Sequence, residues 1–314
     1  MPHLLFIAPE DLNEAVLAAA AYEAALAAVP GATATIICAP ETRDLYRAAP
    51  RLASLRTWDA SDGFAPWLTL AWSKARTPFD LVVDLRNAPA SYAVRAKRRI
   101  RRRSSRLLRH RLEDFAALFG DERLAPRLWL DDAAREAAAA VASDGPLLVL
   151  APGAESASKT WPGERFAAVA RRLVGGAGPL SGARVIALGE AERTRPVAAS
   201  LDADGVPALD AAGKLDLLAS AALLERATLL IANANPLMQI GAAMGAPTLG
   251  LFGPTDERVF GPTGPRSRAL RGRAYEEIMA LEHAGLDARP LMDDLSVDAV
   301  EAAALELLHA GGLS

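Results

Sequence analysis

The chain has 314 residues, of which 51% are hydrophobic, 23% charged and 5% aromatic, and its formal net charge is −3. These values are typical of a folded globular chain and exclude general disorder, and a charge so near zero argues against a nucleic-acid-binding protein. The single cysteine, Cys38, cannot form an internal disulfide or a metal cluster, so we expect a reducing compartment, the cytoplasm by default. We expect no secretory signal and no transmembrane helix, because no apolar run reaches the ~20 residues that span a bilayer.

Short apolar segments alternate with helical patterns along the chain. In the first half, strands are predicted at residues 3–8, 33–38 and 81–85, with a helix at 14–28. In the second half, strands are predicted at 147–150, 184–188, 228–232 and 248–252, with a helix at 162–174. Strands that alternate with helices form parallel sheets covered on both faces, so the predicted fold class is α/β.

A turn cluster at residues 143–146 separates an Ala-rich helical pattern from the next buried strand. We therefore expect a first domain at residues 1–142 and a second at 143–295. A last helix is predicted at 297–308, within a C-terminal stretch of 296–314, with Ser296 as its N-cap. The sequence leaves open which half this helix packs against.

Two strand-to-helix loops of the second half suit an anion. Lys159 directly precedes a helix start, where a mobile positive charge could clamp a phosphate; the alternative is a solvated surface lysine. Asn235 can cap the next such helix and Pro236 can fill its first turn, leaving free amides that favour a diphosphate; the alternative is an ordinary cap. Small residues from Gly241 to Gly245 would let this helix lie close to the sheet. Open parallel sheets bind ligands at the carboxyl ends of their strands, where both loops are expected.

Carboxylates surround the first helix start of the chain, at Glu10, Asp11 and Glu14. A carboxylate there could act as a general base on a substrate hydroxyl. The alternative is that acidic residues simply favour the positive end of the helix dipole.

Ten Lys or Arg residues and no acidic residue lie between Arg95 and Arg111. Such a run suits lipid headgroups or a phosphorylated glycolipid, and RNA less well because the run contains no aromatic residue. The alternative is a solvated helix face. The residues that we assign to this acceptor or membrane surface are Arg101, Arg102, Arg103 and Arg106.

Other chemistry is disfavoured by the sequence. The four histidines are scattered without a second ligand at metal spacing, so we predict no metal site and no cofactor. The chain contains neither a Walker-type loop nor a Gly-x-Ser-x-Gly elbow, which argues against an NTPase and an α/β-hydrolase.

Five segments, taken in order and spacing, resemble glycosyltransferase family 9, the family of the ADP-heptose:lipopolysaccharide heptosyltransferases. They are Phe79-Asp-Leu-Val-Val-Asp-Leu85, the Pro-Gly-Ala loop with Lys159-Thr-Trp-Pro, Val185-Ile-Ala-Leu-Gly-Glu-Ala-Glu-Arg193, Ala212-Gly-Lys-Leu-Asp-Leu-Leu218, and Ile231 through Leu-Phe-Gly-Pro-Thr-Asp256. The resemblance covers nearly the whole chain.

The resemblance implies a GT-B fold, with two Rossmann-like halves facing a cleft: an N-terminal acceptor half and a C-terminal nucleotide-sugar donor half. It implies an inverting, metal-independent transfer in which a base in the first half activates the acceptor hydroxyl, and it assigns that role to Glu14. Lys159 matches the donor-phosphate lysine, and Gly189 with Glu190 or Glu192 matches the nucleoside contact. The residues assigned to donor binding are Lys159, Gly189, Glu190, Glu192, Asn233, Asn235, Leu237, Met238 and Gln239.

The chain departs from the family pattern at both sites. The family's Gly-Asp, which supplies the base, is Asn13-Glu14 here. Its Asn-Asp-Ser-Gly-Leu-Met-His motif is Asn233-Ala-Asn-Pro-Leu-Met-Gln239, so an acidic residue, a glycine and a histidine are replaced. Pro236 removes an N–H, and Gln239 carries no charge, so we expect altered donor binding.

Two functional hypotheses follow. The first is a transferase that moves a heptose-like sugar from a nucleotide-sugar donor to an anionic glycolipid or lipopolysaccharide-type acceptor, in the cytoplasm at the inner face of the membrane, with peripheral membrane contact and without nucleic acid. The second is a catalytically silent relative that binds a glycan, a nucleotide or a protein.

Overall fold

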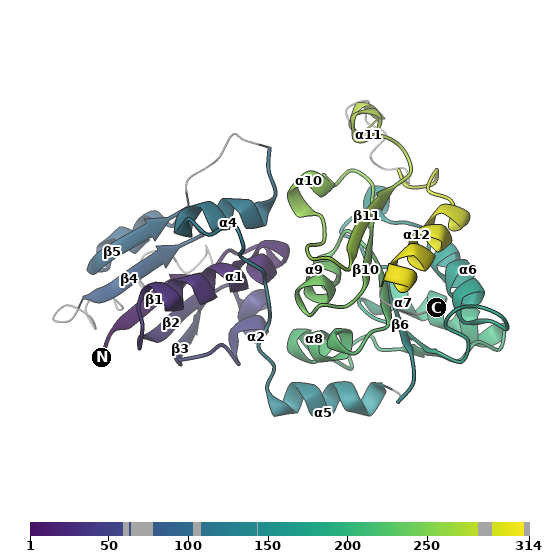
Figure 1. Ribbon diagram of the computed structural model, residues 1–314, viewed down its shortest axis with the longest axis horizontal. Helices are drawn as coiled ribbons and strands as arrows, with labels where there is room; N and C mark the ends of the chain where they lie inside the picture. Colours follow the sequence, from purple (N-terminus) through teal and green to yellow (C-terminus); the bar gives the residue numbers. More distant parts are fainter. Residues whose placement is uncertain (59–62, 64–77, 103–107, 143, 282–290, 311–314) are drawn as a thin grey trace. The chain divides into compact units, whose positions relative to one another are not determined.

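The computed structural model describes residues 1–58, 63, 78–102, 108–142, 144–281 and 291–310. The chain divides into two compact units, Met1–Trp129 and Leu130–Ser314. Each unit contains one sheet, and every strand pair in both sheets is parallel, which confirms the α/β class (Figure 1).

The sheet of the first unit has five strands in the order β3-β2-β1-β4-β5. The strands are β1 (His3–Ile7), β2 (Thr33–Cys38), β3 (Leu52–Thr57), β4 (Phe79–Asp84) and β5 (Ala96–Arg101). The helices are α1 (Leu12–Ala28), η1 (Pro40–Thr42), α2 (Arg43–Tyr46), η3 (Pro89–Ala93) and α4 (Arg111–Phe119), and α1 and α4 lie side by side (Figure 1). The central strands β1, β2 and β4 are almost continuously buried, which is why their apolar runs predicted them.

The strand β5 was not predicted, because it lies inside the basic run. Its residues Ala96–Arg101 pair with Phe79–Asp84 of β4, from Phe79↔Ala96 to Asp84↔Arg101. The strand stands at the edge of the sheet and is only partly buried, so charged side chains can point to solvent. The helical alternative for the basic run is therefore wrong over these residues.

The sheet of the second unit has six strands in the order β11-β10-β9-β6-β7-β8. The strands are β6 (Leu147–Ala151), β7 (Arg184–Ala187), β8 (Ala208–Asp210), β9 (Leu229–Asn233), β10 (Thr248–Phe252) and β11 (Ser267–Arg271). The helices are α5 (Asp132–Val141), η4 (Ala157–Lys159), α6 (Gly163–Val174), α7 (Ala191–Ala203), α8 (Leu217–Glu225), α9 (Pro236–Ala243), α10 (Glu257–Phe260), α11 (Tyr275–Leu281) and α12 (Val297–Ala310).

The last helix packs on the second unit, a question that the sequence left open. α12 lies beside α6 and against β10 and β11 (Figure 1). Its buried residues Val300 and Ala304 join the same apolar core as Trp161 and Phe166, whose rings meet edge to face at 5.0 Å.

The division between the units falls after Trp129. The Trp129 indole donates to Glu23 Oε1 (2.6 Å) and meets the Tyr22 ring edge-on, within the first unit. α5 instead contacts α8, and Arg135 pairs with Glu225 at 2.9 Å, within the second. The functional division at residues 142/143 stays a prediction.

The small residues of α9 bring this helix close to the sheet, as expected. A Cβ atom added at Gly241 would lie 2.3 Å from Leu230 Cδ2 of β9, far inside van der Waals contact. A side chain at position 241 would therefore require the buried Leu230 side chain to move, and the glycine lets α9 lie close to β9 without that shift.

Candidate functional site

The loop after β6 is tied to the end of β9 by two buried asparagines. Asn233 Nδ2 donates to the carbonyl of Pro152 (2.7 Å), and its Oδ1 accepts the N–H of Trp161 (3.1 Å). Asn235 Nδ2 donates to the carbonyl of Gly153 (2.9 Å). The two loops that the sequence singled out as suited to anions are thus joined into one structure at the carboxyl edge of the sheet.

The start of α9 has the cap and the first-turn proline that the sequence predicted. Asn235 is its N-cap, and Asn235 Oδ1 accepts the N–H of Met238 at 3.1 Å. Pro236 occupies the first turn and has no N–H. The N–H of Met238 is therefore already bonded and position 236 has none, so a phosphate at this helix start would depend more on side chains such as Lys159.

Lys159 ends the short turn η4 and is accessible. Its side chain is 32% exposed, and its Nζ lies 2.8 Å from Glu155 Oε2 in an ion pair whose carboxylate is 73% exposed. Exposed pairs of this kind contribute little free energy, so an incoming phosphate can compete for the lysine.

The loop after β7 meets the start of α9. Gly189 has φ +133°, a conformation that favours glycine, and a Cβ there would lie 3.8 Å from Leu237 Cδ1. Glu190 is the exposed N-cap of α7 and Glu192 stands exposed in its first turn. The loops after β6, β7 and β9 therefore gather at one edge of the second sheet, with Lys159, Leu237 and the two glutamates accessible to solvent.

Met238 and Gln239 lie inside the unit. Each is 1% exposed, and Gln239 Nε2 donates to the carbonyl of Phe260 (2.6 Å). The other amide atom, Gln239 Oε1, is buried and finds no hydrogen-bond partner among the described residues. In this arrangement Gln239 ties α9 to the end of α10.

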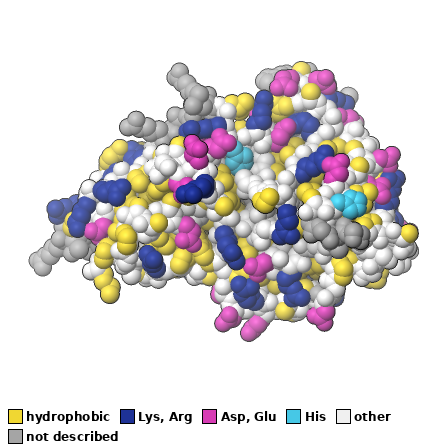
Figure 2. Space-filling view, viewed as in Figure 1, with side chains coloured by type: hydrophobic (Ala, Val, Ile, Leu, Met, Phe, Trp, Pro, Cys, Tyr) yellow, Lys and Arg dark blue, Asp and Glu magenta, His cyan; other side chains and the backbone are white. Residues whose placement is uncertain are grey.

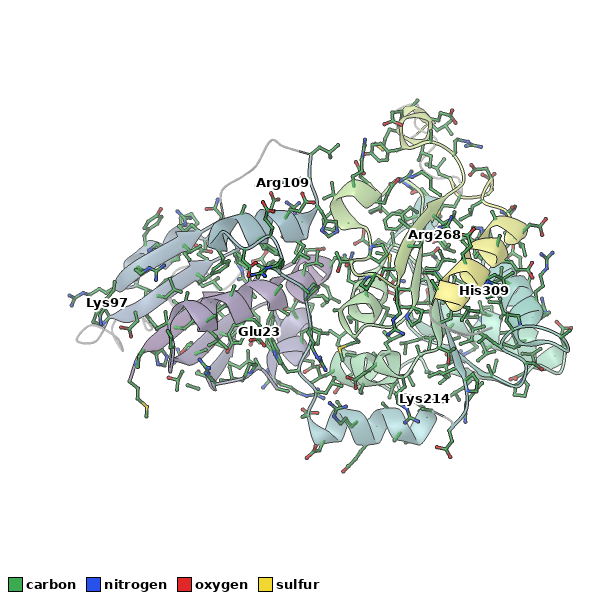
Figure 3. The ribbon with its side chains drawn as sticks, viewed as in Figure 1. Glu23, Lys97, Arg109, Lys214, Arg268 and His309 are labelled. Carbon is green, nitrogen blue, oxygen red and sulfur yellow. The ribbon has the colours of Figure 1, made fainter. Side chains whose placement is uncertain are left out.

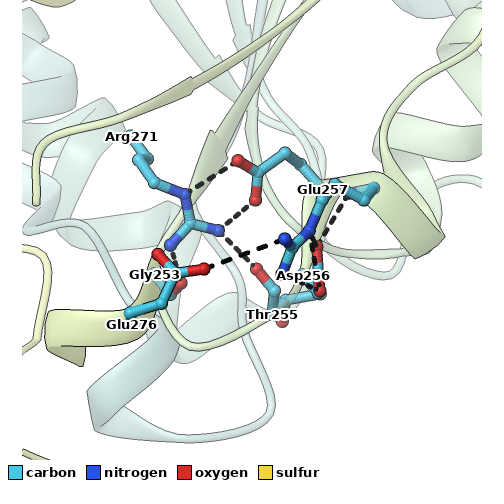
Figure 4. A network of polar contacts seen from close by, with 7 residues as sticks. Gly253, Thr255, Asp256, Glu257, Arg271 and Glu276 are labelled. Atoms are coloured by element: carbon cyan, nitrogen blue, oxygen red, sulfur yellow. Dashed lines mark hydrogen bonds and ion pairs between the residues drawn. The ribbon is translucent and has the colours of Figure 1, made fainter. Parts of the chain in front are cut away.

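A network that the sequence analysis missed shapes the loop after β10 (Figure 4). Arg271, at the end of β11, donates to the carbonyls of Gly253 and Thr255, each at 2.8 Å, and pairs with Glu257. Arg258 binds both oxygens of Asp256, and this contact lowers the pKa of that carboxyl. A Gly-Pro pair such as Gly253-Pro254 is typical of a loop, but nothing in the local sequence indicates that Arg271 binds this loop.

In the first unit, Glu14 does not stand free. Arg102 Nη1 donates to Glu14 Oε2 (2.5 Å), and Arg111 Nε lies 2.8 Å from Glu14 Oε1. The Glu14 backbone N–H is capped by Asp11 Oδ1 (2.9 Å). The helix-start position of Glu14 is as predicted, while its two arginine partners come from the basic run.

The rest of the basic run is largely paired within its own unit. Arg101 bonds Asn87 Oδ1 (2.7 Å) and Tyr92, and its Nε lies 3.4 Å from the fully buried Asp84. Lys97 pairs with Asp80, whose carboxyl pKa this contact lowers. Arg103 and Arg106 lie outside the described residues.

The described residues of the basic run are spread along the first unit. Lys97 near the start of β5 and Arg109 just before α4 lie at opposite ends of the unit (Figure 3). On the face shown in Figure 2, basic side chains are interspersed with acidic ones. Across the described part of the chain, no group of three or more His, Cys, Asp or Glu residues could hold a metal ion, and no helix is long and apolar enough to cross a membrane.

Two Rossmann-like units, each built on a parallel sheet, define the GT-B fold, and solved structures support this class. A glycosyltransferase of family 9 from Veillonella parvula matches with a TM-score of 0.83 and 20% identity, over 98% of this chain and 97% of that one. The ADP-heptose lipopolysaccharide heptosyltransferase II of Escherichia coli matches with a TM-score of 0.79 and 18% identity, over 99% and 100%.

The sequence comparisons identify the family. Lipopolysaccharide heptosyltransferase 2 of Salmonella typhimurium is 26% identical over 136 residues, which are 42% of this chain and only 38% of that relative. The profile of glycosyltransferase family 9 (heptosyltransferase) matches residues 80–283. The chain belongs to glycosyltransferase family 9.

Proposed function

We propose that this protein is an inverting, metal-independent glycosyltransferase that moves a heptose-like sugar from a nucleotide-sugar donor to an anionic glycolipid or lipopolysaccharide-type acceptor. Family membership supports a transferase of this kind. The E. coli protein with the same fold is named for ADP-heptose, which makes an ADP-sugar the first donor to test.

The observation that carries the proposal is the joining of three strand-end loops in the second unit. Asn233 and Asn235 fix the loop that holds Lys159 against the start of α9, and Gly189 lies against Leu237 of the same helix. Carboxyl-edge loops of parallel sheets are where nucleotides bind. Lys159 would neutralise the leaving diphosphate, while Glu190 or Glu192 would bind hydroxyls of the nucleoside.

On the acceptor side, Glu14 is the proposed base. The glutamate would take the proton of the acceptor hydroxyl as that oxygen attacks the anomeric carbon and the nucleoside diphosphate departs from the opposite side. Inversion at that carbon follows from the single displacement. Glu14 must first release at least one of its two arginines, since both carboxylate oxygens are engaged.

The test is a transfer assay on the purified chain. ADP-, GDP- and UDP-sugars are supplied with and without a heptose-accepting lipopolysaccharide core, and nucleotide release and sugar incorporation are measured. We expect acceptor-dependent release from an ADP-sugar, and its reduction by orders of magnitude in Glu14→Gln, in line with the ~10²–10⁴-fold effect of a general base.

A catalytically silent relative is the second candidate, and specific observations favour it. The carboxylate of Glu14 is held by Arg102 and Arg111, and the donor-motif residues Asn233 and Gln239 are buried and bonded within their own unit. Binding of ADP measured by calorimetry, without release from any donor sugar, would select this candidate.

Contact with the inner face of the membrane is part of the proposal. Among the arginines assigned to it, Arg101 and Arg102 are engaged with Asn87 and Glu14. Lys97 and Arg98 of β5 are exposed, and although Lys97 pairs with Asp80, they are better placed to meet anionic lipid than the shielded Arg101 and Arg102.

A further inference from the structure

Five charged side chains of the first unit form one connected network at the starts of α1 and α4 and the end of β5. Glu14 binds Arg102 and Arg111; Arg111 Nη1 donates to Asp114 Oδ2 (2.7 Å); and Arg109 donates to Asp114 Oδ1. The three central side chains are well shielded, with 13% of Glu14, 21% of Arg102 and 20% of Arg111 exposed. Ion pairs at this depth are stronger than exposed pairs, because water screens them less.

Within the described part of the chain, these contacts join three guanidinium groups and two carboxylates. Asp114 is held by two arginines from its own helix start and the residues before it, whereas Glu14 reaches the network from a different helix. Glu14 therefore acts as a separate anion bound between Arg102 and Arg111.

Both arginines make contacts besides those to Glu14. The backbone N–H of Arg102 donates to the carbonyl of Asp84 (3.0 Å), and its guanidinium lies 5.8 Å from the centre of the buried Phe115 ring. Arg111 is the first residue of α4 and is fixed by Asp114 three positions further on. The two guanidinium groups that meet Glu14 together form a fork of donors that suits a planar or tetrahedral oxyanion.

The Glu14 carboxylate has a second stabilising position, at the start of its own helix. It stands three residues after the N-cap Asp11, whose Oδ1 already accepts the Glu14 N–H at 2.9 Å. In a complete capping box, the glutamate at this position turns back to accept the N–H of the N-cap residue. A carboxylate that leaves the arginines therefore remains stabilised at the helix start by that bond and by the helix dipole.

We propose that Arg102 and Arg111 form an oxyanion-binding site that Glu14 occupies in this structure, and that a carboxylate or phosphate monoester on the acceptor saccharide exchanges for Glu14. A carboxylate that replaces Glu14 leaves the charge of the network unchanged, whereas a phosphate monoester brings about one further negative charge to the arginines. The released Glu14 carboxylate is then free to accept the proton of the acceptor hydroxyl. Arg102 is a positioning residue in this scheme: it couples binding of the acceptor's anion to release of the base. The inference rests on the proposed function for the identity of the ligand as an acceptor and for the proton transfer, while the anion site itself is tested independently of transfer.

The test measures saccharide binding to the full chain by calorimetry, with glucose 6-phosphate, glucuronate and glucose as probes. Glu14→Gln keeps the shape of the side chain and removes its charge. We expect it to raise the affinity for the anionic probes about tenfold or more, because the internal competitor for two charge-assisted contacts is lost. Glucose should be unaffected. Comparison of the affinities for glucose 6-phosphate and glucuronate shows whether Arg102 and Arg111 bind a phosphate or a carboxylate more tightly.

Two further variants make the test specific. The double variant Glu14→Gln/Arg102→Gln should lose the increased affinity for the anionic probes. The double variant Glu14→Gln/Arg102→Lys should keep part of that increase. Asp80→Asn is the matched control, since it frees Lys97 from an ion pair on the same unit without touching the fork. If Glu14→Gln does not fold by circular dichroism, Glu14→Asp tests the same idea, because its shorter side chain competes less well.

The inference is overturned if Glu14→Gln binds the anionic probes no better than the unchanged chain, or no better than Asp80→Asn does. Failure of the proposed function looks different. ADP binding and sugar transfer are measured separately, so a chain that transfers sugar but shows no Glu14-dependent anion affinity refutes only the exchange. A chain that shows the exchange but transfers nothing refutes only the transferase.

Discussion

Asn233 holds the main chain of Trp161: its buried Oδ1 accepts the Trp161 N–H at 3.1 Å, while its Nδ2 donates to Pro152 at the other end of the same loop. One amide side chain therefore closes the loop that carries Lys159. Because Asn233 is fully buried, both of its hydrogen bonds replace bonds to water that no longer exist in the fold.

Asn233→Asp should destabilise the second unit by about 3 kcal/mol. A carboxylate cannot donate to Pro152, and its charge would be buried against that carbonyl. Thermal unfolding followed by circular dichroism should show a fall in Tm of about 2–4 °C per kcal/mol. Asn13→Asp in the first turn of α1 is the control, since the helix dipole favours a carboxylate there, and it should leave Tm almost unchanged. Equal Tm values for the two variants would contradict a stabilising role for the two Asn233 hydrogen bonds.

Lys159→Ala should weaken ADP binding by about tenfold to a hundredfold, the effect of losing one charge-assisted contact to a phosphate. The fold should be unaffected, because the side chain pairs only with the exposed Glu155. Calorimetric titration with ADP measures the effect. Lys97→Ala removes a comparable surface pair with Asp80 and serves as the control. Similar ADP affinity in both variants would show that Lys159 does not contribute to ADP binding.

Gly241→Val should cost about 1–3 kcal/mol of unfolding free energy, since even a Cβ at this position would lie 2.3 Å from Leu230 Cδ2. Ala242→Val, one position along the same helix and only partly buried, introduces the same side chain with the same helix propensity. Denaturant unfolding of the two variants separates packing from propensity. A loss in Ala242→Val as large as that in Gly241→Val would argue against close packing of α9 on β9.

Cys38 should resist thiol reagents in the folded chain. Burial raises the pKa of its thiol from 9.0 to about 11, so the thiol is neutral at pH 8 and inaccessible. Above pH 9 the unfolded chain forms the thiolate while the folded chain does not, so this group lowers stability as the pH rises from 9 toward 11. Cys38→Ala should flatten that part of the stability profile. Rapid labelling of the native chain at pH 8 would contradict the buried position.

Lys97→Gln combined with Arg98→Gln should weaken binding to anionic phospholipid vesicles more at low salt than at high salt, because exposed charges are screened within ~10 Å at 0.1 M ionic strength. Arg101→Gln should instead lower stability, because Arg101 faces the fully buried Asp84. Vesicle co-sedimentation and thermal unfolding measure the two effects. If the unchanged chain does not bind anionic vesicles at low salt, the proposed membrane contact of the basic residues 95–111 is wrong.

The positions of the central strands and their helices followed from the sequence because each has a local cause. The buried runs at residues 33–38 and 248–252 coincide with β2 and β10, since a strand covered on both faces is apolar along its whole length. The cap of α9 was readable from Asn235-Pro236, because a capping side chain bonds an amide only three residues away.

The strand β5 and the partners of Glu14 were decided by tertiary structure. A run of Lys and Arg has no strand pattern of its own, and Ala96–Arg101 become a strand because the edge of β4 offers unpaired backbone groups. Arg102 lies 88 residues from Glu14, so the ion pair depends on where the sheet order brings the end of β5. The sequence by itself determined which residues are charged and which segments are buried. Which opposite charges meet was set only by the fold, because such pairing depends on distances in space that no local pattern encodes.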